Sequence, residues 1–120
     1  MRIELPSDPT SPSLARRAVD QACQGLAVDL DAVLLCTSEV VTNALLHGIP
    51  PMELEVSIGD SWVRIAVHDR GRGDVERRRQ VRPDTLSGRG LGIVEMLASR
   101  WGSEHTAAGK VIWFEMAAGG

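Results

Sequence analysis

The sequence predicts an α+β fold in which helices cover one face of a mixed, mostly antiparallel sheet. Residues 53–58 and 62–68 alternate between polar and apolar side chains, and a Gly59-Asp60 turn separates them. This pattern indicates an antiparallel hairpin with one buried face. Three other segments carry apolar residues at helical spacing. Because the expected order is strand, two helices, hairpin, helix and hairpin, a doubly wound parallel sheet is disfavoured.

The first segments of the chain are expected to form an edge strand and a helix. Residues 2–5 alternate between polar and apolar before Pro6, which is typical of a short edge strand. A serine followed by a proline starts the helix predicted for residues 11–24, and Gly25 is expected to stop it. The residues expected to face inward are Leu14, Ala18, Val19 and Ala22.

A second helix is expected to end at Gly48, because two consecutive prolines follow shortly after it. Either Asp29 or Asp31 can cap its first turn. One side of the helix carries a carboxylate, an amide and an imidazole spaced four residues apart, here called the polar stripe: Glu39, Asn43 and His47. The other side carries apolar residues: Val40, Val41, Ala44 and Leu45. Since Lys–Glu pairs are the ordinary filling of an exposed helix face, the polar stripe is a candidate for chemistry.

The second half of the chain is expected to contain a polar loop, a helix and a closing hairpin. Residues 74–87 have little apolar material, which predicts a mobile loop. The helix is predicted to open with the glycines of residues 88–92 and to end near Arg100. Its expected inward residues are Ile93, Val94, Leu97 and Ala98. Residues 101–104 and 110–116 predict the last two strands, joined by a turn.

Length and composition indicate an ordinary globular protein. At 120 residues the chain fits a single domain over residues 1–120. Hydrophobic residues make up 43% and charged residues 24%, as in soluble domains. The net charge of -3 gives no electrostatic reason to expect nucleic acid or an anionic membrane as a partner. All cationic side chains except Lys110 are arginines, a bias typical of GC-rich bacterial genomes.

Cysteine usage and the absence of targeting signals favour a cytoplasmic protein. Cys23 and Cys36 lack the spacing of a structural zinc site and are expected to be small buried apolar residues in a reducing compartment. No apolar run is expected to reach the roughly 18 residues of a membrane helix. The first residues also lack the apolar core of a signal peptide.

Two glycine clusters are the remaining motifs. Residues 69–73, Asp-Arg-Gly-Arg-Gly, follow the second hairpin strand, and residues 88–92, Gly-Arg-Gly-Leu-Gly, open a helix. The second cluster is no Rossmann fingerprint, because Ile93 stands where the third glycine is required, and neither cluster contains the Gly-Lys pair of a P-loop. A glycine-rich helix entrance still favours an anion such as phosphate. Asp69 taken alone is better explained as a turn-capping aspartate.

In combination and in this order, the polar stripe and the two glycine clusters resemble the GHKL ATPase superfamily. This group includes the catalytic domains of histidine kinases, DNA gyrase and the serine kinases that act as anti-sigma factors. The resemblance runs from about Asp29 to the end of the chain. Residues 38–44, Ser-Glu-Val-Val-Thr-Asn-Ala, followed by His47 and Gly48, are most similar to the anti-sigma-factor kinase branch. It implies a Bergerat-type two-layer α/β sandwich with about three helices on one sheet face.

The resemblance assigns roles to four polar residues. Glu39 matches the general base, which deprotonates water or a substrate hydroxyl, although a helix-face ion pair also explains this carboxylate. Asn43 matches the Mg²⁺ ligand, which suits a hard cation that keeps several waters. His47 can reach a phosphate or simply complement the helix dipole. Asp69 matches the aspartate that accepts a hydrogen bond from the adenine amine, which would discriminate against GTP.

The resemblance also assigns the glycines. Gly71 and Gly73 leave room for the base. The second cluster surrounds the phosphates, and its expected cofactor-binding residues are Gly88, Arg89, Gly90, Leu91 and Gly92. Residues 74–87 match the ATP lid, whose arginines either stabilise charge on the transferring phosphoryl group or contact a partner. Because the lid is short and neither a phosphoacceptor helix nor a transducer domain is visible, we expect a free-standing regulator rather than a complete histidine kinase or topoisomerase.

The expected function is that of an ATP- and Mg²⁺-dependent protein serine/threonine kinase. Its substrate would be a small antagonist protein, and a sigma factor is a further expected partner. The alternative is a non-catalytic ATP-dependent protein-interaction switch. The retained Glu39 favours chemistry. Related kinases pair through their first strand and helix, which makes a homodimer an expectation as well.

Overall fold

The computed structural model describes residues 1–71 and 86–119, with only the backbone given for residues 86–90. Its strands are β1 (Arg2–Leu5), β2 (Met52–Ile58), β3 (Trp62–Asp69), β4 (Arg100–Thr106) and β5 (Gly109–Ala117). Its helices are α1 (Ser11–Ala22), α2 (Leu30–His47) and α4 (Leu86–Leu97). Gly73 and all but the last two residues of the expected lid lie outside the described residues.

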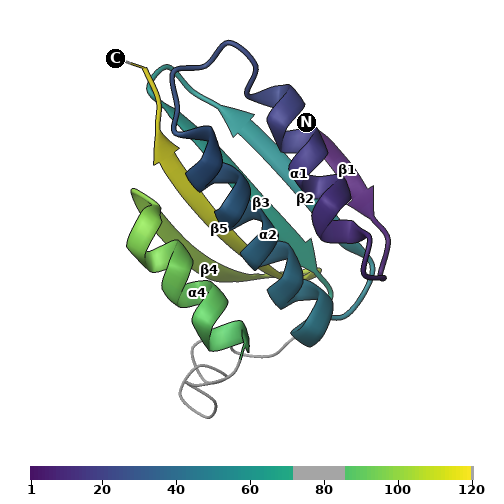
Figure 1. Ribbon diagram of the computed structural model, residues 1–120. Coiled ribbons are helices and arrows are strands. Elements are labelled where there is room, and N and C mark those ends of the chain that lie inside the picture. The colour runs from purple at the N-terminus through teal and green to yellow at the C-terminus, as the bar shows by residue number, and fades with distance from the viewer. Residues whose placement is uncertain (72–85, 120) are drawn as a thin grey trace.

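The described strands form one sheet in the order β1-β2-β3-β5-β4 (Figure 1). Helices α1, α2 and α4 lie side by side on one face of this sheet, with α2 between the other two. The predicted α+β fold with helices on one face is therefore confirmed. Every pair among the described strands is antiparallel, in agreement with the mostly antiparallel sheet that was predicted. Sequence patterns show where strands lie but leave the direction of distant neighbours open.

The strand expectations hold in detail. Strand β1 lies at one edge and pairs with β2 from Arg2 opposite Glu55 to Leu5 opposite Met52. Strands β2 and β3 form the predicted hairpin, which the Gly59 N–H closes by donating to the carbonyl of Trp62 at 2.9 Å. Side chains of β2 alternate, and those facing the helices are buried: Met52, Leu54 and Val56.

Helix α1 begins and ends close to the predicted residues, but its inward face differs. Thr10 occupies the N-cap position, Pro12 lies in the first turn, and Gly25 has the positive φ of 82° expected after a helix end. Leu14 was expected to face inward and is instead 38% exposed. The buried positions are spaced four residues apart, at Ser11, Ala15 and Val19. Small side chains at these positions let α1 lie close to α2 and the sheet.

Helix α2 is the central helix of the layer. Asp29 is its cap, accepting a hydrogen bond from the Ala32 N–H at 3.2 Å, and Gly48 follows its last residue as predicted. By length and mean hydropathy α2 could cross a membrane, so the expectation that no segment qualifies was wrong. Here its apolar side is covered by protein, because Val33, Val40 and Val41 are buried in the main core.

Helix α4 begins at Leu86, so the glycines of the second cluster lie within its first turns rather than ahead of it. Leu91 and Val94 are buried in the core. Leu97 was expected to face inward but is 41% exposed, and the helix ends there rather than near Arg100. Buried or partly buried positions recur at 91, 94 and 98, which leaves position 97 on the solvent side.

The main core lies between the helices and the sheet, and a smaller cluster lies on the opposite, helix-free face. This second cluster consists of Ala66, Val111 and Trp113. The guanidinium of Arg64 lies 4.1 Å from the centre of the Trp113 ring, and that of Arg100 lies 5.7 Å from it. Both arginines also pair with Glu115. On the helix-free face, the arginine side chains therefore cover Trp113 through cation–π contacts and ion pairs, where no helix lies.

Candidate functional site

The polar stripe of α2 is only partly exposed. Asn43 is buried, with 4% of its surface exposed, while Glu39 and His47 are half-buried. Glu39 also lies close enough to the Cys36 thiol to affect it. Burial first, and the negative charge of Glu39 second, raise the pKa of Cys36 to about 11. The stripe therefore presents its groups from a partly desolvated helix side, where charges interact more strongly than in water.

Asp69 is the last residue of β3, and its two carboxylate oxygens have different environments. Oδ1 accepts hydrogen bonds from the N–H of Gly71 at 2.6 Å and from the N–H of Ile49 at 3.4 Å. Oδ2 is buried and has no hydrogen-bond partner among the described residues. The side chain is almost fully buried, and the Lys110 Nζ lies 3.9 Å from Oδ2. One oxygen thus holds the local backbone, while the other is left as a buried acceptor.

Glycines surround Asp69 closely. A Cβ at Gly48 would lie 2.7 Å from the Asp69 Cγ, and one at Gly71 would lie 2.7 Å from Oδ1. Gly109 has a φ of 154°, and a Cβ there would overlap the backbone oxygen of Asp69. The end of α2, the end of β3 and the start of β5 therefore meet at this carboxylate. Only glycine permits so close an approach without moving the backbone.

Hydrogen bonds join the segment that follows α2 to the end of β3. The segment after α2 accepts a bond at the Ile49 carbonyl from the N–H of Arg70 at 2.8 Å, while the Ile49 N–H donates to Asp69. Asn43 and His47 lie in the last turns of the helix that leads directly into this segment. The structure therefore brings the C-terminal half of α2 and Asp69 together, which the sequence predicted only through a resemblance.

The second glycine cluster lies in a helix that packs against α2. Its Leu91 side chain is buried in the core, so only its backbone is available to a ligand. A Cβ at Gly92 would meet no atom of the described chain within 4 Å. Gly88, Arg89 and Gly90 are placed in α4 by their backbone alone. Contact between α4 and α2 is thus established, whereas Gly73 lies outside the described residues.

Lys110 is the residue at this site that sequence reasoning missed. It lies opposite Asp69 in the β3–β5 register, and its side chain is 2% exposed. The available signal was that the single lysine of the chain begins a mostly apolar strand. The residue opposite Asp69 is set by the register of β3 and β5, and the sequence of neither strand alone specifies that register.

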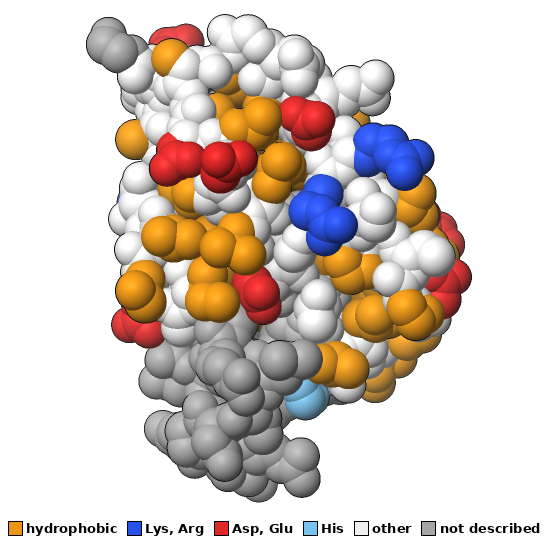
Figure 2. Space-filling view, in the orientation of Figure 1, with side chains coloured by type: hydrophobic (Ala, Val, Ile, Leu, Met, Phe, Trp, Pro, Cys, Tyr) orange, Lys and Arg blue, Asp and Glu red, His pale blue; other side chains and the backbone are white. Residues whose placement is uncertain are grey.

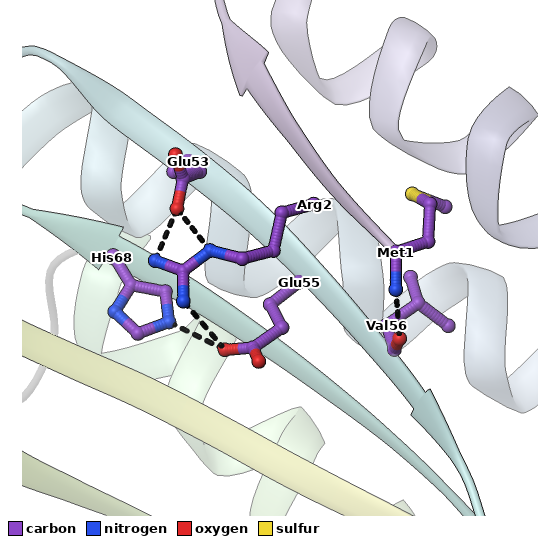
Figure 3. Close-up of polar contacts among 6 residues, drawn as sticks. All are labelled: Met1, Arg2, Glu53, Glu55, Val56 and His68. Carbon is purple, nitrogen blue, oxygen red and sulfur yellow. Dashed lines mark hydrogen bonds and ion pairs between the residues drawn. The ribbon is translucent and has the colours of Figure 1, made fainter.

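A polar network on the helix-free face was also missed. Arg2 pairs with both Glu53 and Glu55, and the His68 Nε2 lies 2.8 Å from Oε1 of Glu55 (Figure 3). The hydrogen bond from His68, with help from the charge of Arg2, lowers the pKa of Glu55 despite some burial. A pocket of about 250 Å³ lies next to this network and includes His68, Asp69 and Arg70 in its lining. The contacts among Arg2, Glu55 and His68 connect β1, β2 and β3 on the helix-free face.

The residues present suit a nucleotide with Mg²⁺ better than a metal centre held by protein alone. Among residues 1–71 and 86–119, no group of three or more His, Cys, Asp or Glu side chains could hold a metal ion. A Mg²⁺ ion that bridges phosphates needs only one or two protein oxygens, and Asn43 supplies an amide carbonyl. The unsatisfied Oδ2 of Asp69 and the glycines around it fit a hydrogen-bonding base that approaches the backbone closely.

Helices on one side of an antiparallel sheet, with the end of α2 close to a carboxylate whose second oxygen has no hydrogen bond among the described residues, define an α/β sandwich with a candidate ligand site. The chain belongs to the histidine kinase-like ATPase domain family, whose model matches residues 5–116. Membership supports ATP as the ligand, with Mg²⁺ as its usual companion in such domains. A search among curated proteins found no match.

Proposed function

We propose that this protein is an ATP- and Mg²⁺-dependent regulatory protein serine/threonine kinase of the anti-sigma-factor type. The observation that carries the proposal is the Oδ2 of Asp69, a buried acceptor without a hydrogen-bond partner among the described residues. Leaving such an atom unpaired costs about 1–3 kcal/mol. A ligand N–H, such as the exocyclic amine of adenine, would remove this cost. The same site lies where the helix that carries Glu39 and Asn43 ends.

The remaining roles are those that the family resemblance implies, and the chemistry of the side chains suits them. Glu39 is half-buried on the same side of α2 as Asn43 and is the proposed base that takes the proton from a substrate hydroxyl. The Asn43 carbonyl would hold Mg²⁺, which neutralises phosphate charge when bound. His47 stands one turn further on, and a phosphate contact is proposed for it. Backbone N–H groups at the start of α4 suit phosphate oxygens.

A protein substrate is part of the proposal. Apolar side chains are exposed on the helix-covered face, over α2 and α4 (Figure 2). They are Leu35, Leu46, Met96 and Leu97. Exposed apolar side chains that gather on one face suit a protein partner. We propose a small antagonist protein as phosphoryl acceptor and a sigma factor as a second partner.

Two further parts of the proposal concern assembly and location. A homodimer is proposed through β1 and α1, since within the described chain β1 pairs only with β2. A cytoplasmic location is proposed because Cys23 and Cys36 are both free and buried, as expected in a reducing compartment.

The test is phosphoryl transfer by the wild type and by Glu39→Gln. Proteins that copurify with the chain are incubated with ATP labelled on the γ-phosphate, and transferred label is counted. Glu39→Gln is expected to bind ATP within about twofold of wild type while transfer falls by roughly 10²–10⁴-fold, the usual contribution of a general base.

Asp31→Asn is the matched control, because it removes a carboxylate from the first turn of the same helix. It is expected to transfer label at the wild-type rate. Equal transfer by Glu39→Gln would remove Glu39 from the mechanism. ATP binding without transfer to any partner would support the non-catalytic interaction switch instead.

A further inference from the structure

The turn between β4 and β5 lies against the backbone that carries Asp69. It spans residues 106–109, and Thr106 is opposite Gly109 in the β4–β5 register. A Cβ at Gly109 would lie 2.1 Å from the backbone oxygen of Asp69 and 2.6 Å from the Cα of Arg70. No real Cβ tolerates such contacts, so the turn and the end of β3 are as close together as glycine allows.

The peptide that follows Asp69 is also held from β2. The Arg70 N–H donates to the Ile49 carbonyl at 2.8 Å, and the Ile49 N–H donates to Asp69 Oδ1 at 3.4 Å. The segment that contains Ile49 leads into β2, while the turn leads into β5, and these two strands are the neighbours of β3 in the sheet. The backbone at Asp69 therefore has a close neighbour on either side, and Gly109 is the one from β5.

Thr106 fixes the shape of this turn. Its Oγ1 accepts hydrogen bonds from the N–H of Gly109 at 3.1 Å and from the N–H of Ala108 at 3.3 Å. A hydroxyl that accepts from the backbone two and three residues further on stabilises a turn. Gly109 has a φ of 154°, which residues with a side chain rarely adopt. The hydroxyl thus holds, and the glycine permits, the backbone path that meets Asp69.

The position of this backbone matters because Asp69 is proposed to contact the base. Its Oδ1 accepts from the backbone N–H groups of Gly71 and Ile49, which leaves Oδ2 as the acceptor for the adenine amine. A hydrogen bond weakens steeply as its angle departs from the optimum. A small displacement of the Asp69 backbone would therefore weaken the base contact. The phosphate contacts proposed for α2 and α4 would stay in place.

We propose that the β4–β5 turn positions the Asp69 carboxylate for the base, with Thr106 and Gly109 as its positioning residues. The inference rests on the proposed nucleotide-binding function and concerns the base contact alone. Neither residue contacts the nucleotide; both act through the backbone of Asp69 and Arg70. Affinity for the base is then set in part by a turn that lies far from Asp69 in the sequence.

Calorimetric titrations with ATP and with purine riboside triphosphate, each with Mg²⁺, test this inference. The second nucleotide lacks the 6-amino group and keeps the ribose and the phosphates, so the ratio of the two Kd values measures the amine contact. Wild-type protein is expected to bind it at least about tenfold more weakly than ATP, as loss of a hydrogen bond to a charged group implies. Partial unfolding affects both titrations equally and leaves the ratio unchanged.

Gly109→Ala is expected to bring this ratio close to one, because its Cβ displaces the backbone at Asp69. Thr106→Val removes the accepting oxygen at nearly constant shape and is expected to lower the ratio in part. Thr106→Ser keeps the hydroxyl and is expected to retain the wild-type ratio. If Gly109→Ala does not fold, the comparison of the two Thr106 variants decides, and a wild-type ratio in Thr106→Val overturns the inference.

Gly25→Ala is the matched control. Gly25 also has a positive φ, of 82°, but a Cβ there would meet no other atom of the described chain within 4 Å. The substitution strains the backbone away from the site and is expected to leave the ratio unchanged; an equal fall in this variant would overturn the inference.

The outcomes separate the inference from the proposed function. ATP binding with a wild-type ratio in both Gly109→Ala and Thr106→Val overturns the inference, while the proposed function stands. A ratio of one in the wild-type protein refutes the adenine contact of Asp69 and the inference with it. If neither nucleotide binds to the wild-type protein, the proposed function itself is refuted.

Discussion

The two carboxylate oxygens of Asp69 have different contacts. Oδ1 fixes the chain that follows α2 and the turn at Gly71, whereas Oδ2 is left as an acceptor inside the protein. A carboxylate used only for turn capping has no need of a buried second oxygen that lacks a hydrogen bond. This arrangement supports the proposed contact between Oδ2 and a ligand.

Asp69→Asn is expected to weaken ATP binding by roughly tenfold or more, because an amide that keeps the Oδ1 bonds must present its NH₂ group where Oδ2 now accepts. Calorimetry with ATP and Mg²⁺ measures the change. Circular dichroism checks folding, since the substitution also removes the counter-charge of Lys110.

Asp60→Asn in the β2–β3 turn is the matched control for this substitution, because Asp60 is exposed and distant in sequence from the glycine clusters. It is expected to bind ATP as wild type does. Unchanged affinity in a folded Asp69→Asn protein would contradict the adenine assignment.

At the scale of single elements, α2 contributes the polar stripe to the candidate site, and hydrogen bonds fix both of its ends. The Asp29 side chain accepts from the Ala32 N–H, and the Gly48 N–H donates to the Ala44 carbonyl at 2.7 Å. A helix that starts and stops at fixed residues fixes the direction of its polar stripe. The bonds made by Ile49 then hold the C-terminal end of this helix next to the end of β3.

Asp29→Ala is expected to lower the free energy of unfolding by about 1 kcal/mol, the usual cost of losing an N-cap. Urea denaturation at neutral pH measures the loss. Asp29→Ser keeps an accepting oxygen and is expected to recover most of it. A loss for Asp29→Ser as large as for Asp29→Ala would show that the cap bond is unimportant.

The contacts of Glu55 with Arg2 and His68 make the free energy of unfolding depend on pH in a defined direction. Because the folded-state pKa of Glu55 lies below its ordinary value of about 4.5, ionised Glu55 stabilises the folded protein above that pH. The contribution is lost as the pH falls through the lowered folded pKa. Glu55→Gln is therefore expected to show a shallower loss of stability between about pH 5 and pH 3 than wild type.

Urea denaturation across that pH range measures the slope for Glu55→Gln. Glu104→Gln, in which an exposed carboxylate of β4 is removed, is the control and is expected to follow wild type. Parallel slopes for wild type and Glu55→Gln would show that the contacts with His68 and Arg2 do not persist in solution.

At the scale of the whole molecule, the candidate site exists only in the folded chain. It combines the end of α2, the end of β3 and the start of β5, which lie far apart in sequence. Ligand that binds the folded state alone raises stability by mass action. The site and the core are therefore thermodynamically linked.

ATP with Mg²⁺ at about one hundred times its Kd is expected to raise the free energy of unfolding by about 2.7 kcal/mol. Thermal unfolding with and without nucleotide shows this as a rise in Tm. Triphosphate without a base is the control and is expected to give a smaller shift, since it cannot reach Asp69. No shift with ATP at saturating concentration would contradict nucleotide binding in the folded state.

Local patterns were enough to predict most elements. Alternation over residues 53–58 and 62–68 predicted the β2–β3 hairpin, and the prolines after Gly48 marked the end of α2. The prediction of inward-facing residues was partly wrong for α1 and α4. In α1, Ala15 is buried and Leu14 is exposed, because a small side chain allows the helix to lie close to its neighbours. In α4, Leu97 lies outside the buried face.

The sequence by itself determined the spacing of Glu39, Asn43 and His47, because helical periodicity is a local property of the chain. It also determined that Gly71 follows Asp69 by two residues. Only the tertiary structure decided that Lys110 faces Asp69 and that Oδ2 lacks a hydrogen-bond partner among the described residues. Strand register and the exclusion of water depend on contacts between distant segments, and no single stretch of sequence encodes them.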